Sequence, residues 1–207
     1  MTLLFGGCSY EHEISMVSAI TVGKLLGIDR YIFLDPKRRF YRIDKENMKS
    51  TYFSSGEYKK SKELFCRGGG FEQKGIFGSK PLETGTVINL IHGADGEDGK
   101  IASLLEFAGV EYIGPRIEAS TLSYNKLLTK LYAASAGIKT LPYEVLTPNN
   151  RTAGLEFPLI VKPLRLGSSI GISVAKDASQ LQYALDVAFE FDEEALIEPF
   201  IEGIKEY

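Results

Sequence analysis

The chain has 207 residues, a formal net charge of −3, and 44% hydrophobic and 25% charged residues. These values predict one large or two small globular domains with a substantial hydrophobic core. The charge excludes a general electrostatic case for nucleic-acid or membrane binding. Two cysteines, Cys8 and Cys66, are too few for a disulfide framework, and no cysteine–histidine cluster predicts structural zinc. The amino-terminal residues lack the features of a signal peptide, so we expect a cytoplasmic protein.

The chain opens with a predicted strand, a glycine-rich turn and a helix. Residues 3–5 form the apolar strand, residues 6–9 the turn, and residues 13–26 the helix, with apolar side chains near helical spacing. In an open α/β sheet, ligands gather beyond the carboxyl ends of the strands, at such turns. The turn lacks the full spacing of a dinucleotide fingerprint, which argues against NAD. Glu11 and Glu13 either hold an amine here or complement the helix dipole.

Short strands and a polar stretch follow. Residues 31–34 and 40–43 are predicted strands, and residues 64–66 and 76–77 are predicted to flank a glycine turn as a hairpin. The polar stretch at residues 54–85 carries no recognisable chemistry, and we expect its lysines to be solvated.

A second candidate site follows a predicted buried strand at residues 87–91. Loop 92–99 is dense in glycine and acidic residues, and a helix is predicted over residues 100–108. The spacing of the acidic residues does not fit a calcium loop. His92 follows the strand directly, where an α/β sheet places ligand contacts, and this position favours a functional over a structural histidine.

A domain boundary is predicted after residue 114, at a Gly-Pro pair. A helix is predicted over residues 120–136 and a strand over residues 140–146. Lys126 and Lys130 are four residues apart on this helix and therefore share one side of it. We expect that one of them can reach a ligand while the other is solvated.

The most distinctive stretch covers residues 157–174. Residues 157–161 are a predicted buried strand, and residues 170–174 alternate as a second strand would. Lys162 ends the first strand, and a Gly/Ser loop that contains Ser168 leads into the second. Backbone N–H groups in such a loop can point at anionic oxygens, and a lysine supplies a point charge. The stretch is thus either a polyphosphate site or an ordinary surface hairpin.

The last predicted elements are an amphipathic helix at residues 178–189 and an edge-like strand at residues 195–201 that carries Glu198. With these elements, the motifs of the chain resemble D-alanine–D-alanine ligases of the ATP-grasp superfamily. The matching stretches, which follow the family order across nearly the whole chain, are residues 6–15, 92–93 with 96–99, 112–114, 123–126, 161–163 with 167–171, and 196–201. Each stretch is a weak signal alone, but six in the correct order are a strong one.

The resemblance implies an α/β protein: an N-terminal open Rossmann-like (pre-ATP-grasp) sheet followed by an incomplete ATP-grasp domain. Residues 1–114 would form the substrate-binding domain, residues 115–197 the central subdomain, and residues 198–207 the start of a truncated C-terminal subdomain. The residues implied for ATP binding are Lys126, Lys162, Glu198, Phe200, Ile201 and Glu206.

Among these residues, the two lysines are similar to the family's phosphate-binding lysines. Glu198 resembles the acidic residue beside the adenine, and Phe200 and Ile201 resemble the hinge backbone and apolar contact that follow it. Glu206 is similar to the glutamate that holds the ribose hydroxyls.

Two residues have implied catalytic roles. Ser168 resembles the loop serine near the γ-phosphate and the first D-alanine, and Glu11 resembles the residue that receives the ammonium of that D-alanine. His92 is similar to a neighbour of the same substrate, and Ser15 to a supporting residue at the substrate site.

The implied activity is the ATP-driven joining of two D-alanines through a D-alanyl phosphate, for peptidoglycan precursor synthesis. Mg²⁺ or Mn²⁺ is expected, with ligands in a carboxyl-terminal part that the family has beyond residue 207, so we expect no metal site within this chain and no activity of this chain alone. The expected partners are D-alanine, ATP and a second copy of the chain, without nucleic acid or membrane. The alternatives are a ligase with another acceptor, such as D-lactate, and a non-catalytic module that binds ATP or an amino acid.

Overall fold

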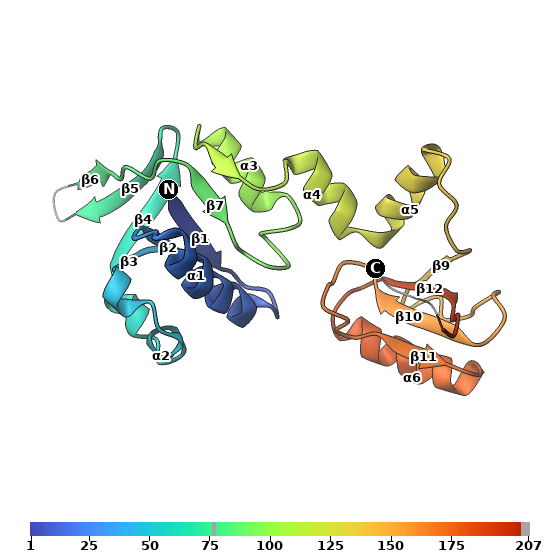
Figure 1. Ribbon diagram of the computed structural model, residues 1–207. Coiled ribbons are helices and arrows are strands. Elements are labelled where there is room, and N and C mark those ends of the chain that lie inside the picture. Colours follow the sequence, from blue (N-terminus) through green and yellow to red (C-terminus); the bar gives the residue numbers. More distant parts are fainter. Residues whose placement is uncertain (76–77, 204–207) are drawn as a thin grey trace. The chain divides into compact units, whose positions relative to one another are not determined.

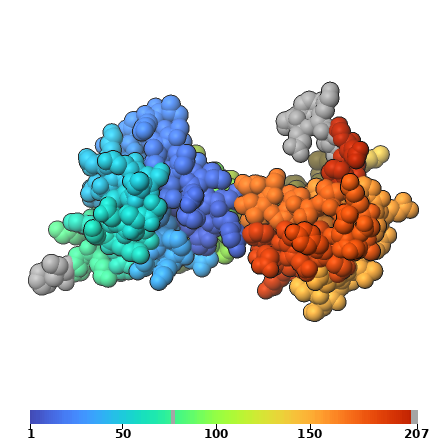
Figure 2. Space-filling model, turned by 90° about the horizontal axis from the view of Figure 1, so that it is seen from below, coloured from blue at the N-terminus to red at the C-terminus, as the bar shows by residue number. Residues whose placement is uncertain are grey.

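The structure is a computed structural model that describes residues 1–75 and 78–203. The chain forms two compact units, Met1–Thr121 (unit 1) and Leu122–Tyr207 (unit 2). Figure 1 shows the elements of each unit, and Figure 2 shows their surfaces, with unit 1 in blue to green and unit 2 in yellow to red. The boundaries predicted at residues 114 and 197 stay predictions.

Unit 1 is built on an eight-stranded sheet with the strand order β6-β5-β4-β3-β2-β1-β7-β8. Its strands are β1 (Thr2–Gly6), β2 (Tyr31–Leu34), β3 (Phe40–Ile43), β4 (Lys62–Arg67), β5 (Gly70–Gly75), β6 (Gly78–Pro81), β7 (Val87–Asn89) and β8 (Tyr112–Ile113). Its helices are α1 (His12–Leu26), α2 (Ser50–Ser54) and α3 (Lys100–Phe107), with short 3-10 helices η1 (Lys45–Asn47) and η2 (Glu57–Lys60). Strand β1 runs parallel to β2 and β7, and β7 runs parallel to β8, as an open α/β sheet requires, while β2 to β6 pair antiparallel.

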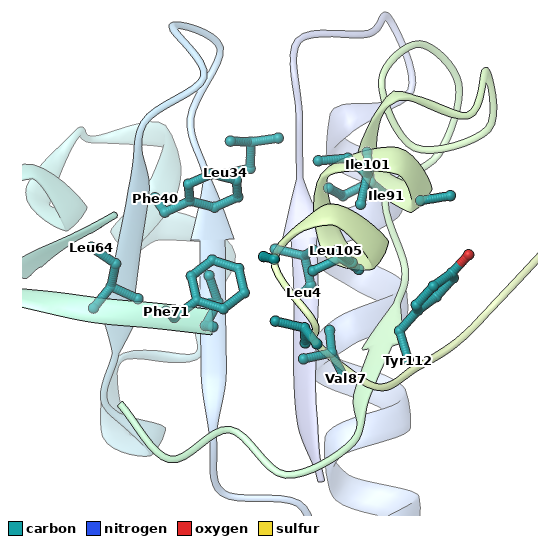
Figure 3. Packing of buried hydrophobic residues seen from close by; sticks show 14 residues of the cluster. Leu4, Leu34, Phe40, Leu64, Phe71, Val87, Ile91, Ile101, Leu105 and Tyr112 are labelled. Atoms are coloured by element: carbon teal, nitrogen blue, oxygen red, sulfur yellow. The ribbon is translucent and has the colours of Figure 1, made fainter. Parts of the chain in front are cut away.

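Both faces of this sheet are buried at β1, which explains why that strand is a continuous apolar run rather than an alternating one. Leu4 points to one face and packs with Leu105 of α3, in the cluster of labelled side chains that Figure 3 shows. Leu3 and Phe5 point to the other face and pack with Met16 of α1. The two helices therefore cover opposite faces, and the carboxyl ends of β1 and β7 remain at the sheet edge.

Unit 2 contains a four-stranded antiparallel sheet with the order β11-β10-β12-β9. Its strands are β9 (Glu144–Leu146), β10 (Leu159–Pro163), β11 (Ser173–Ala175) and β12 (Ala195–Pro199), and its helices are α5 (Lys126–Ser135) and α6 (Ala178–Phe189). Helix α4 (Ile117–Tyr124) crosses the division between the units. Leu181 and Leu185 of α6 pack on Val161 and Ile197, so α6 covers one face of the sheet.

The structure corrects three predictions about unit 2. The predicted helix at residues 120–136 is two helices, because Asn125 adopts an extended backbone and caps α5 by accepting hydrogen bonds from the N–H groups of Leu127 and Leu128. Strand β12 was expected at an edge but lies between β10 and β9. The strand predicted over residues 140–146 begins only at Glu144.

The remaining elements follow the predictions with shifted ends. The second strand of the central hairpin starts at Ser173 rather than at residue 170, because Ser168, Ser169 and Gly171 all have positive φ values of 50°, 56° and 73°. Residues 64–66 lie in β4, which pairs with β5, while residues 76–77 lie outside the described residues.

Candidate functional site

In unit 1, the turn after β1 and the loop after β7 are tied together by hydrogen bonds. The Ser9 hydroxyl donates to the backbone carbonyl of His92 at 2.6 Å and accepts from the N–H of Glu11 at 3.1 Å. The carboxyl ends of parallel strands meet at this edge of the sheet, which is where open α/β folds bind ligands. Ser9 thus places Glu11 beside the loop that carries His92.

Glu11 is buried against this loop. Its residue exposure is 5%, and a Cβ atom added at Gly93 would lie 2.6 Å from its Oε2 atom. Gly93 also has a φ of 69°, so both the space and the backbone favour glycine there. A carboxylate in such a poorly hydrated position interacts strongly with a cation that reaches it.

Ser15 contacts the last residue of β1, and His92 accepts the hydrogen bond from the Ser9 hydroxyl of this turn. The Ser15 hydroxyl donates to the carbonyl of Leu90 at 2.6 Å and accepts from the N–H of Gly6 at 2.8 Å, and the residue is fully buried. Ser15 therefore links α1 to the ends of two strands, which fits a supporting role. The His92 ring lies 3.2 Å from the Ser18 hydroxyl and 3.8 Å from the Glu97 carboxylate, and its side chain is 34% exposed.

A neighbouring group in unit 1 was missed from the sequence. Asp95 accepts two hydrogen bonds from the Arg38 guanidinium, at 2.8 and 3.0 Å, and one from the Cys8 thiol at 3.1 Å. Burial acts to raise the pKa of the Asp95 carboxyl, but these hydrogen bonds lower the pKa below its ordinary value. The ion pair joins residues 57 positions apart, so no local sequence pattern predicts it.

In unit 2, Lys162 and Glu198 project from the face of the sheet that α6 does not cover. Ile160 pairs with Glu198, and Lys162 pairs with Leu196. Because neighbours two apart on a strand share a face, the lysine and the glutamate are diagonal neighbours. The Lys162 amine donates to Glu198 Oε2 at 2.7 Å, and the glutamate side chain is only 7% exposed.

Lys130 approaches the same carboxylate from α5. Its amine lies 2.5 Å from Glu198 Oε1, and its side chain is 11% exposed. Burial acts to raise the pKa of Glu198, but the hydrogen bonds from Lys130 and Lys162 lower it overall. The expectation that one lysine of the Lys126–Lys130 pair would be solvated is therefore wrong, because both amines point into unit 2.

Lys126 is held by the Gly/Ser loop itself. Its amine donates to the backbone carbonyls of Pro163 at 2.7 Å and of Leu166 at 2.6 Å. Burial lowers the pKa of this amine, and the positive charge of Lys162 lowers it further. Lys126 and Lys162 therefore repel each other, and an anion bound between them would reduce this repulsion.

The loop between β10 and β11 is anchored at its start and tightly wound in its middle. The N–H of Arg165 donates to Asp192 Oδ2 at 2.7 Å, and the Arg165 guanidinium pairs with Asp192 and Glu194. At Ser168 the φ is 50°, a left-handed backbone that non-glycine residues seldom adopt and that clusters at ligand sites.

Two other residues implied for the nucleotide, Phe200 and Ile201, directly follow β12. The N–H of Phe200 donates to the carbonyl of Pro158 at 2.8 Å, which continues the β10–β12 pairing by one residue. Ile201 is 44% exposed, so its side chain is accessible to an apolar ligand surface. Glu206 lies outside the described residues.

The described residues contain neither a metal-ligand group nor a membrane-spanning helix. Within residues 1–75 and 78–203, no group of three or more histidine, cysteine, aspartate or glutamate side chains could hold a metal ion. In the same ranges, no helix is long and apolar enough to cross a membrane.

Two family models match the chain. The model described as "D-ala D-ala ligase N-terminus" matches residues 1–115, and the one described as "D-ala D-ala ligase C-terminus" matches residues 133–206. The first model alone covers more than half of the chain.

Relatives with the same description are similar over the whole chain. A D-alanine–D-alanine ligase of Wolinella succinogenes is 60% identical over 100% of this chain and 61% of its own length. The crystal structure of a D-alanine–D-alanine ligase from Helicobacter pylori has a TM-score of 0.93 and 52% identity, and covers 99% of this chain and 64% of that one. A ligase structure from Coxiella burnetii has a TM-score of 0.84 at 27% identity, with 98% and 64% covered. This chain thus spans about 60% of the length of the curated relatives it matches.

Proposed function

The chain belongs to the D-alanine–D-alanine ligase family, and on that premise we propose that the protein is an ATP-dependent ligase that joins two D-alanines. The observation that carries the proposal is that Lys130 and Lys162 both bind the buried Glu198 carboxylate, while Lys126 lies beside them against a loop with left-handed backbone at Ser168. A cationic group beside exposed backbone donors suits a polyphosphate.

We assign nucleotide binding to unit 2. Lys126 and Lys162 would contact the phosphates, and Glu198, Phe200 and Ile201 would line the adenine. Lys126 now donates to two loop carbonyls, so an incoming phosphate would compete with neutral acceptors and gain a charge-assisted bond. Glu206 would hold the ribose.

We assign the first D-alanine to unit 1. The buried carboxylate of Glu11 would receive the ammonium group, since a cation is held more strongly by a carboxylate away from water. His92, which is partly exposed at the same loop, would lie beside this substrate, and Ser15 would support the turn.

The proposed reaction has two steps. A carboxylate oxygen of the first D-alanine attacks the γ-phosphorus of ATP, which forms a D-alanyl phosphate and releases ADP. The amine of the second D-alanine then attacks the acyl carbon, the new C–N bond forms, and inorganic phosphate and a proton leave. ATP is needed because a free carboxylate is a poor acyl donor, and the lysines offset the repulsion between two anions. Ser168 would lie near the transferred phosphate.

Mg²⁺ or Mn²⁺ is part of the proposal, but the described residues do not supply a metal-ligand group, so we derive no step through a metal. We further propose that the protein acts in the cytoplasm, makes a peptidoglycan precursor, and forms a homodimer.

The test is an assay of the protein expressed from its full natural coding sequence, with ATP and Mg²⁺. We expect phosphate release that depends on D-alanine and yields D-alanyl-D-alanine by mass spectrometry. If the product formed preferentially from D-lactate or D-serine, that compound would be assigned as the acceptor in place of the second D-alanine. ATP binding without any acceptor-dependent phosphate release would favour a non-catalytic module. Light scattering of the same sample tests the homodimer.

A further inference from the structure

Lys130 is a largely buried lysine with three partners. Its amine lies 2.5 Å from Glu198 Oε1, donates to the backbone carbonyl of Leu141 at 3.0 Å, and sits over the Tyr143 ring at 5.0 Å from the centroid. Its side chain is 11% exposed. Holding a lysine amine away from water is unfavourable unless its charge is compensated. The contacts of Lys130 therefore serve either the ligand site or the stability of the fold.

The contacts of Glu198 divide evenly between two lysines. One carboxylate oxygen faces Lys130 of α5, and the other accepts a hydrogen bond from Lys162 of β10 at 2.7 Å. Two positive charges and one negative charge leave the group with one uncompensated positive charge. In a poorly hydrated site, a carboxylate with a single lysine partner holds that lysine tightly.

A nucleotide phosphate that approaches Lys162 must compete with Glu198 for the same amine. If Lys130 were absent, Lys162 would be the only cation bonded to a buried carboxylate, and its departure would leave that carboxylate uncompensated. With Lys130 in place, Glu198 keeps an ion pair after Lys162 turns away.

We propose that Lys130 is a positioning residue of the nucleotide site, which compensates Glu198 so that Lys162 is available to a phosphate of ATP. The inference rests on the proposed function of unit 2 as the nucleotide site. Lys130 does not touch the nucleotide in this account, and it acts through Glu198.

A purely structural role for Lys130 makes a different prediction. Its bond to the Leu141 carbonyl could simply fix α5 to the segment before β9. Loss of that bond would lower stability, and it would affect ATP binding equally whether or not position 198 carries a charge. The two roles are therefore separated by the energetic coupling between positions 130 and 198.

The experiment measures the Kd for ATP by calorimetry in four forms of the protein expressed from its full natural coding sequence: unchanged, Lys130→Met, Glu198→Gln, and the double variant. Lys176→Met, at an exposed lysine after β11, is the matched control. A second readout, without nucleotide, is the rate at which acetic anhydride labels Lys162. If Lys130→Met does not fold, Lys130→Gln keeps a donor for Leu141 without the charge.

We expect Lys130→Met to weaken ATP binding by about 10-fold to 100-fold, and to cost less than about threefold in the Glu198→Gln background. Labelling of Lys162 should slow in Lys130→Met, since its amine would then be the only lysine partner of Glu198 and less accessible to the reagent, and should quicken in Glu198→Gln, which removes that ion pair. The control should match the unchanged protein.

If Lys130→Met weakened ATP binding equally with Glu or Gln at position 198, or weakened it in neither case, the inference would be overturned. The proposed function would still stand, because the unchanged protein would bind ATP. If the unchanged protein bound no ATP, the proposed function would fail and the inference would fall with it.

Discussion

The two units differ in the charge that accompanies their buried carboxylates. In unit 1 the buried charged side chains are carboxylates at turns that follow strands: Asp35 and Asp95 each pair with an arginine, and Glu11 lies beside the loop of His92. In the described part of unit 2, the buried carboxylate Glu198 is bound by two lysine amines. The carboxylate of Glu11 suits a small cation such as an ammonium group, and the surplus of lysines at Glu198 suits a polyanion.

This difference shows that the class of ligand of a site can be inferred from the sign of the site's charge, even where each residue also has a structural partner. Asp95 is fully engaged by Arg38 and Cys8, and Lys126 by two backbone carbonyls. What separates the units is the charge that an arriving ligand would find.

The largest effect is expected at Lys162. We expect Lys162→Ala to lower the D-alanine-dependent rate of phosphate release by about 10²–10³-fold, because a developing phosphate charge loses its partner. Steady-state kinetics with saturating D-alanine measures it, and Lys176→Ala is the exposed control. Turnover within about twofold of the unchanged protein would remove Lys162 from the site.

The matching change in unit 1 is Glu11→Gln. We expect the KM for the first D-alanine to rise by about 10-fold to 100-fold, because the ammonium loses a charged acceptor, while the Kd for ATP stays unchanged. Glu13→Gln, which alters an exposed carboxylate two residues away, should change neither constant. An unchanged KM in Glu11→Gln would exclude this carboxylate from the substrate site.

A smaller effect is expected from Gly93→Ala, which tests the packing around Glu11. The new Cβ would lie 2.6 Å from the carboxylate and 2.9 Å from the Ser9 Cβ, at a φ of 69°. We expect unit 1 to lose about 1–3 kcal/mol of stability, measured by urea unfolding with amide exchange in β1 as the probe. Gly109→Ala is a matched control, since its φ is 71° and nothing lies within 4 Å; an equal loss there would attribute the effect to the backbone alone.

The smallest effect concerns the acid sensitivity of unit 1. The pKa of folded Asp95 is below its unfolded value of about 3.9, so this carboxylate stabilises the fold fully above that pH, and its contribution is lost as the pH falls through the folded pKa. In Arg38→Met the pKa of Asp95 should move upward, and the free energy of unfolding of unit 1 should be about 1 kcal/mol lower near pH 7 than in the unchanged protein. When the pH is lowered from 5 to 3, the free energy of unfolding should fall less in Arg38→Met than in the unchanged protein. Urea unfolding across that range measures it, and parallel curves for the two proteins would refute the assignment.

Local sequence patterns predicted the helices and strands that frame each site. The strand, glycine turn and helix at the amino terminus form β1 and α1, and Lys162 stands at the end of a strand as expected. The break at Asn125 was missed, although asparagine is a preferred capping residue, because the apolar spacing continues across it.

Partners that are distant in sequence could not be predicted. Lys130 was expected to be solvated if Lys126 reached a ligand, because a helix face reveals which residues share a side but not what lies opposite. Its partner, Glu198, lies on β12, whose interior position in the sheet depends on pairing with both β10 and β9. Strand order is a property of the assembled sheet, and no local periodicity encodes it.

The most direct test of the division of labour is hydrogen–deuterium exchange of the protein expressed from its full natural coding sequence, with ATP alone and with D-alanine alone. We expect ATP to slow exchange in α5, in the loop at residues 164–172 and in β12, and D-alanine to slow exchange at residues 8–15 and 90–97. Protection of residues 8–15 by ATP alone, with no change in unit 2, would contradict this division of labour.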